Sequence, residues 1–277
     1  MVSRAPVEVP VYISTAGEGV AGVVTVPGEP DAQVGVILMA GRARDRTHRN
    51  GMWVEAAREL AERGMYALRL DYPGVGNSTG DPVVFDLERP PTFAVQAAAR
   101  FLLEHTPVRR VILAATCFGG RVVLDAAPEI PEVDAVAVIA SPVYARGATV
   151  RTRLRSLVRR ARRRTPQVVE SSMGNRAQQQ REVGPPVEQR VSPAFARALT
   201  GFLRRGTVYF LYAENDFVTD ELRFALEQLR PDASRYRLDV LPGDLHSFRS
   251  LDAQRTTIDL VVSWCERVAA ERPVARV

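Results

Sequence analysis

Short apolar segments of this chain alternate with stretches of helical periodicity, and this alternation limits the possible folds more than any other feature. Val34–Ala40 is a continuous apolar run, which is typical of a strand buried on both faces. Two β-rich runs, Val9–Ala16 and Val20–Pro27, are separated by a Gly-Glu-Gly turn and predict an N-terminal hairpin. Further strands are expected at Tyr66–Leu70, Val111–Ala115, Ala135–Ala140, Val208–Ala213 and Tyr236–Leu241.

Helical patterns separate the expected strands. The first has Trp53, Ala56 and Leu60 at helical spacing, and Gly64 stands where a C-terminal cap glycine belongs. Further helices are expected at Phe93–His105, Arg121–Ala127, Glu221–Leu229 and Asp252–Ala270. Strands that alternate with helices predict a mostly parallel sheet with helices on both faces. The ligand of such a sheet binds at the carboxyl ends of the strands, so we look for a site in the loops there.

Size and composition fit this architecture. With 277 residues and 46% hydrophobic residues, the chain can bury the core of one large domain, or of one domain with an insertion. No apolar run reaches membrane-spanning length, and no secretory signal is visible near Met1. Two widely separated cysteines, Cys117 and Cys265, favour the reducing cytoplasm over a disulfide framework. No metal-ligand spacing and no phosphate-binding glycine loop is visible, so we expect no metal and no cofactor.

Positive charge is concentrated in one segment. The sequence has 37 basic residues, all of them arginine, and a formal net charge of +5. Residues 144–200 hold 13 arginines and three acidic residues, a net charge of +10, which leaves −5 for the rest of the chain. Eight of these arginines lie in residues 150–164, around an apolar stripe at helical spacing. One basic segment on an acidic body, with no aromatic residues interleaved, argues against a nucleic-acid binder.

A candidate nucleophile, Cys117, lies at an expected strand-to-helix junction. A nucleophile on so sharp a turn needs small residues two positions before and after it, here Ala115 and Gly119. The helix that begins here would stabilise a thiolate, and the N–H of Phe118 would face a developing oxyanion. The alternative is an inert cysteine packed in the core, and the following pair of glycines argues against it.

The candidate base is His246, which follows the last expected strand and precedes the last helix. Of the other two histidines, His105 ends a helix at the opposite edge of the sheet. His48 lies near the site, on a polar stretch that we expect to be mobile. Asp216 follows the Val208–Ala213 strand and is the candidate that orients His246; Glu214 is the alternative. An acid at this place can also serve only to shape a turn.

These features resemble the α/β-hydrolase superfamily. The resemblance rests on the junction at Cys117, on the order Cys117, Asp216, His246, and on the loop Asp71–Gly80. That loop is similar to the Asp-x-x-Gly-x-Gly-x-Ser-x-Gly segment common after the fourth strand of these proteins. Cysteine in place of the usual serine is similar to the dienelactone-hydrolase branch and to some acyl-transferring members.

The resemblance covers most of residues 20–143 and 205–270 and implies the α/β-hydrolase fold. It divides the chain into a core, residues 1–143 and 205–277, and a basic cap or lid inserted at residues 144–204. It also implies a second oxyanion donor in the loop after the third strand, which maps onto Gly41 and the N–H of Arg42. Gly41, Arg46 and His48 of this arginine-rich loop are candidates for gripping a substrate carboxylate or phosphate. A solvated polar loop is the alternative.

The leading functional hypothesis is hydrolysis of an ester or thioester through Cys117, His246 and Asp216, with an acyl-cysteine intermediate. The alternatives are acyl transfer to an alcohol or amine, elimination of a small acid with His246 as the base, and a binding protein without catalysis. The basic segment 150–164 predicts an anionic partner, which is an acidic carrier protein bearing a phosphopantetheine thioester, an anionic substrate, or an anionic membrane surface. A solvated lid helix is the alternative for this segment.

Overall fold

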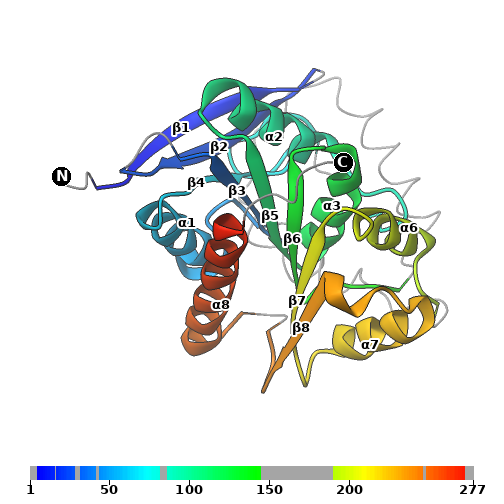
Figure 1. The fold of residues 1–277 in the computed structure, drawn as a ribbon. Coiled ribbons are helices and arrows are strands. Elements are labelled where there is room, and N and C mark those ends of the chain that lie inside the picture. The colour runs from blue at the N-terminus through cyan, green and yellow to red at the C-terminus, as the bar shows by residue number, and fades with distance from the viewer. Residues whose placement is uncertain are drawn as a thin grey trace, which may run out of the picture.

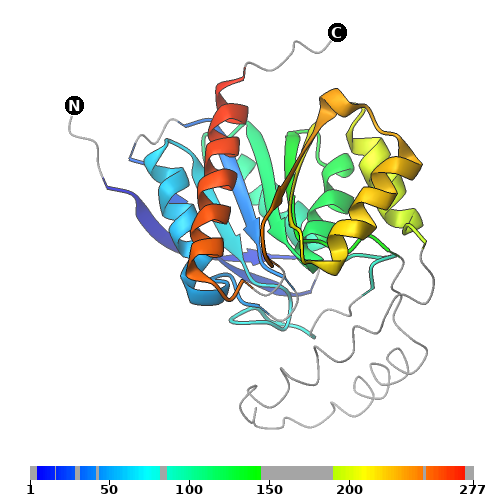
Figure 2. The same ribbon diagram turned by 90° about the horizontal axis from the view of Figure 1, so that it is seen from below.

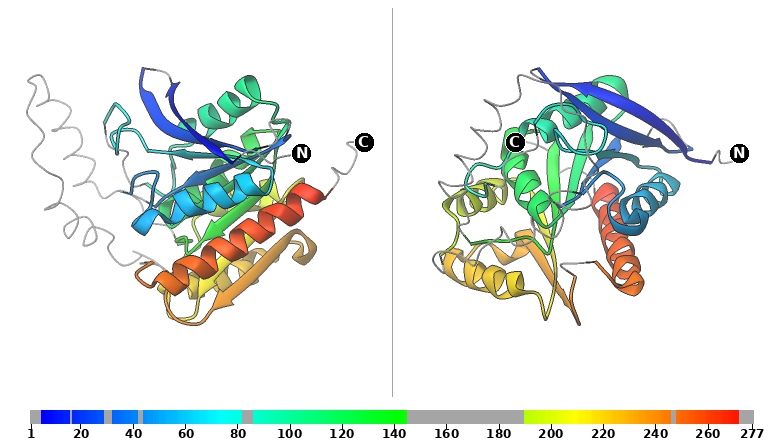
Figure 3. Two further views of the ribbon diagram at one scale, coloured as in Figure 1. Left: turned by 90° about the vertical axis from the view of Figure 1, so that its left-hand side faces the viewer. Right: turned by 180° about the vertical axis from the view of Figure 1, so that it is seen from behind.

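The computed structural model describes residues 5–15, 17–28, 32–41, 44–81, 86–144, 190–245 and 248–271. These residues form an eight-stranded sheet in the order β1-β2-β4-β3-β5-β6-β7-β8 (Figure 1). The strands are β1 Val7–Ser14, β2 Gly19–Val26, β3 Val34–Met39, β4 Tyr66–Leu70, β5 Arg110–Thr116, β6 Val133–Ile139, β7 Thr207–Ala213 and β8 Tyr236–Leu241. β2 is antiparallel to β1 and β4, and all other neighbouring strands are parallel. The N-terminal hairpin lies at one edge and β8 at the other (Figure 3).

Helices cover both faces of the sheet, as the sequence predicts. They are α1 Met52–Glu62, α2 Phe93–His105, α3 Phe118–Ala126, α6 Pro193–Phe202, α7 Phe217–Leu229 and α8 Leu251–Ala270. α1 and α8 lie together on one face, and the other four helices cover the opposite face (Figure 2). The central strands are buried along nearly their whole length, which explains why β3, β5 and β6 are continuous apolar runs. In the described part of the chain, no helix is long and apolar enough to cross a membrane.

α6 is the one described α-helix that the sequence pattern did not predict. It begins at Pro193, and the Ser192 side chain caps it by accepting a hydrogen bond from the N–H of Phe195. Its apolar side chains, among them Phe195 and Phe202, are buried against the core beside α3. This helix falls within residues 144–204, the predicted insertion. The predicted cap helix, 150–164, lies outside the described residues.

The described residues that follow β6 and those that precede α6 lie next to each other. Tyr144 and Val191 form an antiparallel bridge, and the N–H of Ser192 donates to Val143 O over 3.1 Å. The buried carboxylate of Glu221 accepts the N–H groups of Val143 and Tyr144 at 2.9 and 3.0 Å. The described residues that flank 145–189 on either side are therefore attached to the core at one place.

Arg121 of α3 contacts these flanking residues from inside the core. Its side chain is fully buried, and the guanidinium donates to Leu87 O at 2.7 Å, to Ser192 Oγ at 3.0 Å and to Pro142 O at 3.4 Å. It also lies over the ring of Phe195. Burial lowers the pKa of Arg121 to about 10, and nearby acidic groups, Glu88 first among them, oppose this change. Arg121 therefore remains charged at neutral pH and joins the segments before and after residues 145–189.

Replacing Arg121 with methionine is expected to destabilise the protein. The change leaves the buried carbonyls of Leu87 and Pro142 without their donor, which costs about 2–4 kcal/mol of unfolding free energy. Urea unfolding measures the loss. Arg100→Met, an equivalent change at an exposed position of α2, is the control and should cost about 0.5 kcal/mol or less. Equal losses in the two variants would contradict a structural role for Arg121.

Candidate active site

Cys117 occupies a strained turn between β5 and α3. Its backbone has φ 51° and ψ −125°, a region that residues with a side chain rarely adopt. Gly119 permits the turn, because a Cβ on it would lie 2.6 Å from Ala40 O. A Cβ on Gly120 would lie 2.9 Å from the Cβ of Ser141. The predicted junction, with small residues around the cysteine, is confirmed.

Neighbouring strands hold this turn in place. The N–H of Cys117 donates to Ile139 O at 2.8 Å, and the Ser141 hydroxyl donates to Cys117 O at 2.7 Å. The Cys117 side chain is only partly buried, unlike Cys265, which lies fully buried in α8. Phe118 is the first residue of α3, so its N–H belongs to the first turn, where helices bind anions.

The end of β3 lies directly beside Cys117. A Cβ on Gly41 would be 3.0 Å from the Cβ of Cys117 and 3.7 Å from its Sγ, so only a glycine backbone fits against the thiol without displacing it. The hydroxyl of Tyr72 donates to Ala40 O at 3.1 Å and fixes the residue before Gly41. Arg42, the predicted second oxyanion donor, lies outside the described residues.

Asp216 lies at the end of β7, where it begins α7. Its carboxylate is buried, with 5% of the residue exposed, and Oδ2 accepts the N–H of Leu245 at 3.2 Å. The N–H of Asn215 donates to Gly243 O at 2.9 Å, so the loops after β7 and β8 are joined at two points. His246 follows Leu245 in the chain and lies outside the described residues.

Glu214, the alternative to Asp216, is exposed. A carboxylate in water is hydrated and mobile, whereas a buried one can hold a partner in a single orientation. Burial and the contact with the β8–α8 loop therefore favour Asp216 over Glu214. His105 ends α2, where its ring stacks on Phe101 and its Nδ1 lies 3.0 Å from Phe101 O.

His48, which the sequence placed near the site on a polar stretch, is buried. The side chain is buried, with 8% exposed, between the rings of Trp53 and Phe248 at centroid distances of 5.8 and 5.0 Å. Its Nε2 lies 3.1 Å from Oγ1 of Thr116, the residue before Cys117. The sequence did not predict this burial, because the polarity of a loop does not reveal aromatic side chains that reach it from other elements.

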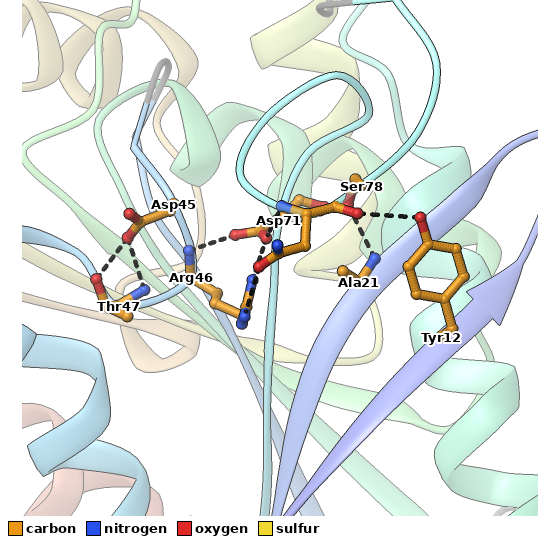
Figure 4. A network of polar contacts seen from close by, with 8 residues as sticks. Tyr12, Ala21, Asp45, Arg46, Thr47, Asp71 and Ser78 are labelled. Atoms are coloured by element: carbon orange, nitrogen blue, oxygen red, sulfur yellow. Dashed lines mark hydrogen bonds and ion pairs between the residues drawn. The ribbon is translucent and has the colours of Figure 1, made fainter. Parts of the chain in front are cut away.

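The side chain of Arg46 is paired with residues of the Asp71–Gly80 loop (Figure 4). Its guanidinium forms an ion pair with Asp71 Oδ2 and donates to Asn77 Oδ1 at 2.9 Å, while its N–H donates to Asp71 Oδ1 at 2.6 Å. Asp71 is fully buried and also accepts the N–H of Asn77 at 3.0 Å. Gly76 is required here, because a Cβ on it would lie 2.3 Å from Asp71 Oδ2. The contact network joins the β3–α1 loop to the Asp71–Gly80 loop.

Among the described residues, no group of three or more His, Cys, Asp or Glu side chains is arranged to hold a metal ion. The site provides instead the thiol of Cys117 and the N–H of Phe118, and a buried carboxylate, Asp216, lies beyond the carboxyl end of β7, two strands away in the sheet. Such groups suit nucleophilic attack on a carbonyl carbon and stabilisation of the resulting oxyanion.

The family model of the "Alpha/beta hydrolase family" matches residues 23–266. The chain belongs to the alpha/beta hydrolase family. Its fold is that of the family, an eight-stranded, mostly parallel sheet with helices on both faces. A search of functionally curated proteins found no match to this alpha/beta hydrolase.

Solved structures share the fold of this alpha/beta hydrolase at low sequence identity. An esterase from Pyrococcus furiosus is 13% identical, with TM-score 0.65 and coverage of 95% of this chain and 93% of that chain. A dienelactone hydrolase from Anabaena variabilis is 18% identical, with TM-score 0.63 and coverage of 95% and 99%. Est1E from Butyrivibrio proteoclasticus, with bound ferulic acid, is 16% identical, with TM-score 0.63 and coverage of 94% and 100%.

The stability of this alpha/beta hydrolase should fall in mild acid because of His48. Burial, and then the charges of Arg44 and Arg49, lower the pKa of His48 to about 3, against the opposing effect of Asp45. Between the ordinary value of 6.5 and pH 3, the unfolded chain binds a proton that the folded protein does not. Unfolding free energy therefore decreases as pH falls through this window, by up to about 4 kcal/mol from this group.

Urea unfolding of wild type and His48→Phe at pH 7.0, 5.5 and 4.5 measures this contribution. The variant is expected to lose less stability than wild type between the first and last pH. His105→Asn, at an exposed position, is the control and should keep the wild-type difference. Parallel pH curves for wild type and His48→Phe would contradict the assignment.

Proposed function

We propose that this alpha/beta hydrolase cleaves an ester or thioester through an acyl-cysteine intermediate. Cys117 is the nucleophile, His246 the general base and Asp216 the residue that orients the imidazole. The observation that carries the proposal is the strained, partly exposed position of Cys117 at the end of β5 and the start of α3. Strain of this kind persists where it serves a site, because other positions lose stability without a return.

The position of Asp216 supports the assignment of the base. Its buried carboxylate binds the N–H of Leu245, the residue before His246. His48 is unsuited as the base, because a group with a pKa of about 3 accepts a proton poorly at neutral pH.

The proposed reaction has two steps. His246 takes the proton of Cys117, and the sulfur attacks the carbonyl carbon, so that a C–S bond forms and the bond to the leaving oxygen or sulfur breaks. The N–H groups of Phe118 and Arg42 stabilise the oxyanion, and the protonated imidazole gives its proton to the leaving group. Water, activated by His246, then attacks the acyl-cysteine and releases the acid. Similarity to an esterase and a dienelactone hydrolase supports a carbonyl substrate.

Other fates of the substrate remain alternatives with distinct readouts. An acyl-cysteine is a thioester, so the same intermediate can pass its acyl group to an alcohol or amine, which would appear as product partition when that acceptor is added. An elimination with His246 as base would survive loss of Cys117 but not loss of His246. An acidic carrier protein at residues 150–164 stays a prediction, because that segment lies outside the described residues.

Cys117→Ala should abolish hydrolysis of activated esters, with kcat/KM at least about 1,000-fold lower, because the alanine cannot form the acyl intermediate. Turnover of a p-nitrophenyl ester measures the rate, and intact mass spectrometry after quenching should find an acyl adduct in the wild type alone. Cys265→Ala is the matched control and should keep the adduct and kcat, since burial raises the pKa of Cys265 to about 12 and keeps it a thiol. Full activity in Cys117→Ala would exclude the covalent mechanism.

Asp216→Asn should lower kcat by about 100-fold or more, because an amide does not stabilise the imidazolium form of His246. Glu214→Gln removes a carboxylate two residues away in an exposed position and should stay within about twofold of wild type. Steady-state kinetics on the same ester compare the two. Equal effects, or a larger effect at Glu214, would transfer the role to Glu214.

A further inference from the structure

His48 contacts both the strand that presents the proposed nucleophile and the loop between β8 and α8. It lies between β3 and α1, and its ring packs edge-on against Phe248, with centroids 5.0 Å apart and an interplanar angle of 89°. Phe248 comes two residues after His246. Its N–H donates to Leu245 O at 3.1 Å, and its carbonyl accepts the side-chain amide of Gln254 at 2.6 Å.

The other side of the imidazole contacts the strand that presents Cys117. Nε2 of His48 lies 3.1 Å from Oγ1 of Thr116, which is fully buried at the end of β5. The second nitrogen, Nδ1, is also buried and has no hydrogen-bond partner among the described residues. A buried nitrogen without a partner costs folding free energy, and a phenylalanine ring would pack here without that cost. What an imidazole adds at this position is therefore the contact with Thr116.

Strained backbone gathers at this contact. His48, Cys117 and Phe248 have φ values of 62°, 51° and 47°, all in the left-handed region that favours glycine. One is the proposed nucleophile; His48 contacts the residue before it, Thr116, and Phe248 packs on the ring of His48. Left-handed residues with side chains persist only where the surrounding contacts hold them.

The imidazole acts here without a charge. Burial keeps the pKa of His48 near 3, assisted by Arg44 and Arg49 and opposed by Asp45, so the ring is neutral at any pH at which a thiol reacts. A neutral ring can align Thr116 but cannot stabilise a thiolate as a charged partner would.

We propose that His48 is a positioning residue for the nucleophile. Through its contact with Thr116 it fixes the backbone that presents Cys117, and the packing of Phe248 on its ring holds the imidazole in place. The inference rests on the proposed function. It concerns alignment of the attacking thiol, so it predicts a loss in kcat with KM retained.

A double-mutant cycle tests this inference. His48→Phe keeps a ring and removes the nitrogens, and Thr116→Val keeps the shape and removes the hydroxyl. Each variant is expected to lower kcat on a p-nitrophenyl ester about tenfold, with KM within about twofold, and the double variant should lose no more than either single one. Thr257→Val is the matched control, because its hydroxyl is buried too but bonds only within α8, to Ala253 O at 2.7 Å; it should retain wild-type kcat.

The pH dependence of Cys117 alkylation by iodoacetamide separates positioning from proton transfer. Its midpoint should stay within about 0.3 pH unit of wild type in His48→Phe, because no charge is removed. A shift of about one unit or more would make His48 an acid–base partner of the thiol and overturn the inference. Losses in kcat that multiply in the double variant, or single variants with unchanged kcat, would also overturn it.

Failure of the proposed function can be distinguished from failure of this inference about His48. It would appear as a wild type that cleaves no ester or as an active Cys117→Ala variant. The bond between His48 and Thr116 would still be tested by stability, since the two losses in unfolding free energy are expected to be non-additive. If His48→Phe does not fold, His48→Asn takes its place in the double-mutant cycle, and Thr116→Val still gives the single-variant kinetic test.

Discussion

The left-handed backbone of Cys117 is the constraint on which the rest of the site depends. A residue with a side chain accepts φ 51° only when its neighbours hold it, and here the neighbours come from both adjacent strands. The N–H of Cys117 is held by β6, and Gly41, at the end of β3, leaves room for the thiol. Gly119 allows α3 to begin against the carbonyl of Ala40. The turn at Cys117 therefore depends on having β3 and β6 as the two neighbours of β5 in the sheet.

The loops around this turn are held by buried polar contacts instead of apolar packing alone. Asp71 joins the β3–α1 loop to the loop after β4, and Asp216 joins the loops after β7 and β8. His48 then links the first of these pairs to the second through Phe248. Buried polar groups are costly unless they are paired, so each contact specifies one arrangement of loops that have few apolar residues of their own.

The sequence predicted most of the helices and strands and missed one described α-helix, α6. α2 begins and ends at the predicted residues, Phe93 and His105, and each predicted strand was found within a few residues of its expected bounds. α6 lies in the arginine-rich segment 144–204, which was interpreted as one inserted cap, although its buried residues recur at helical spacing. The capping serine and Pro193 were a signal that could have found it. His48 lies near the site, as predicted, but its burial was not predicted because it depends on Trp53 and Phe248, and Phe248 is 200 residues away in the chain.

By itself, the sequence determined the order of strands and helices, the small residues around Cys117 and the loop that begins at Asp71, because each is a local pattern of size or polarity. Only the tertiary structure decided which carboxylate is buried, which arginine is already paired and where His48 lies. Asp216 and Glu214 are two residues apart and chemically alike, yet one is buried against the β8–α8 loop and the other is exposed. Burial and pairing are set by residues distant in the chain, so no local pattern can specify them.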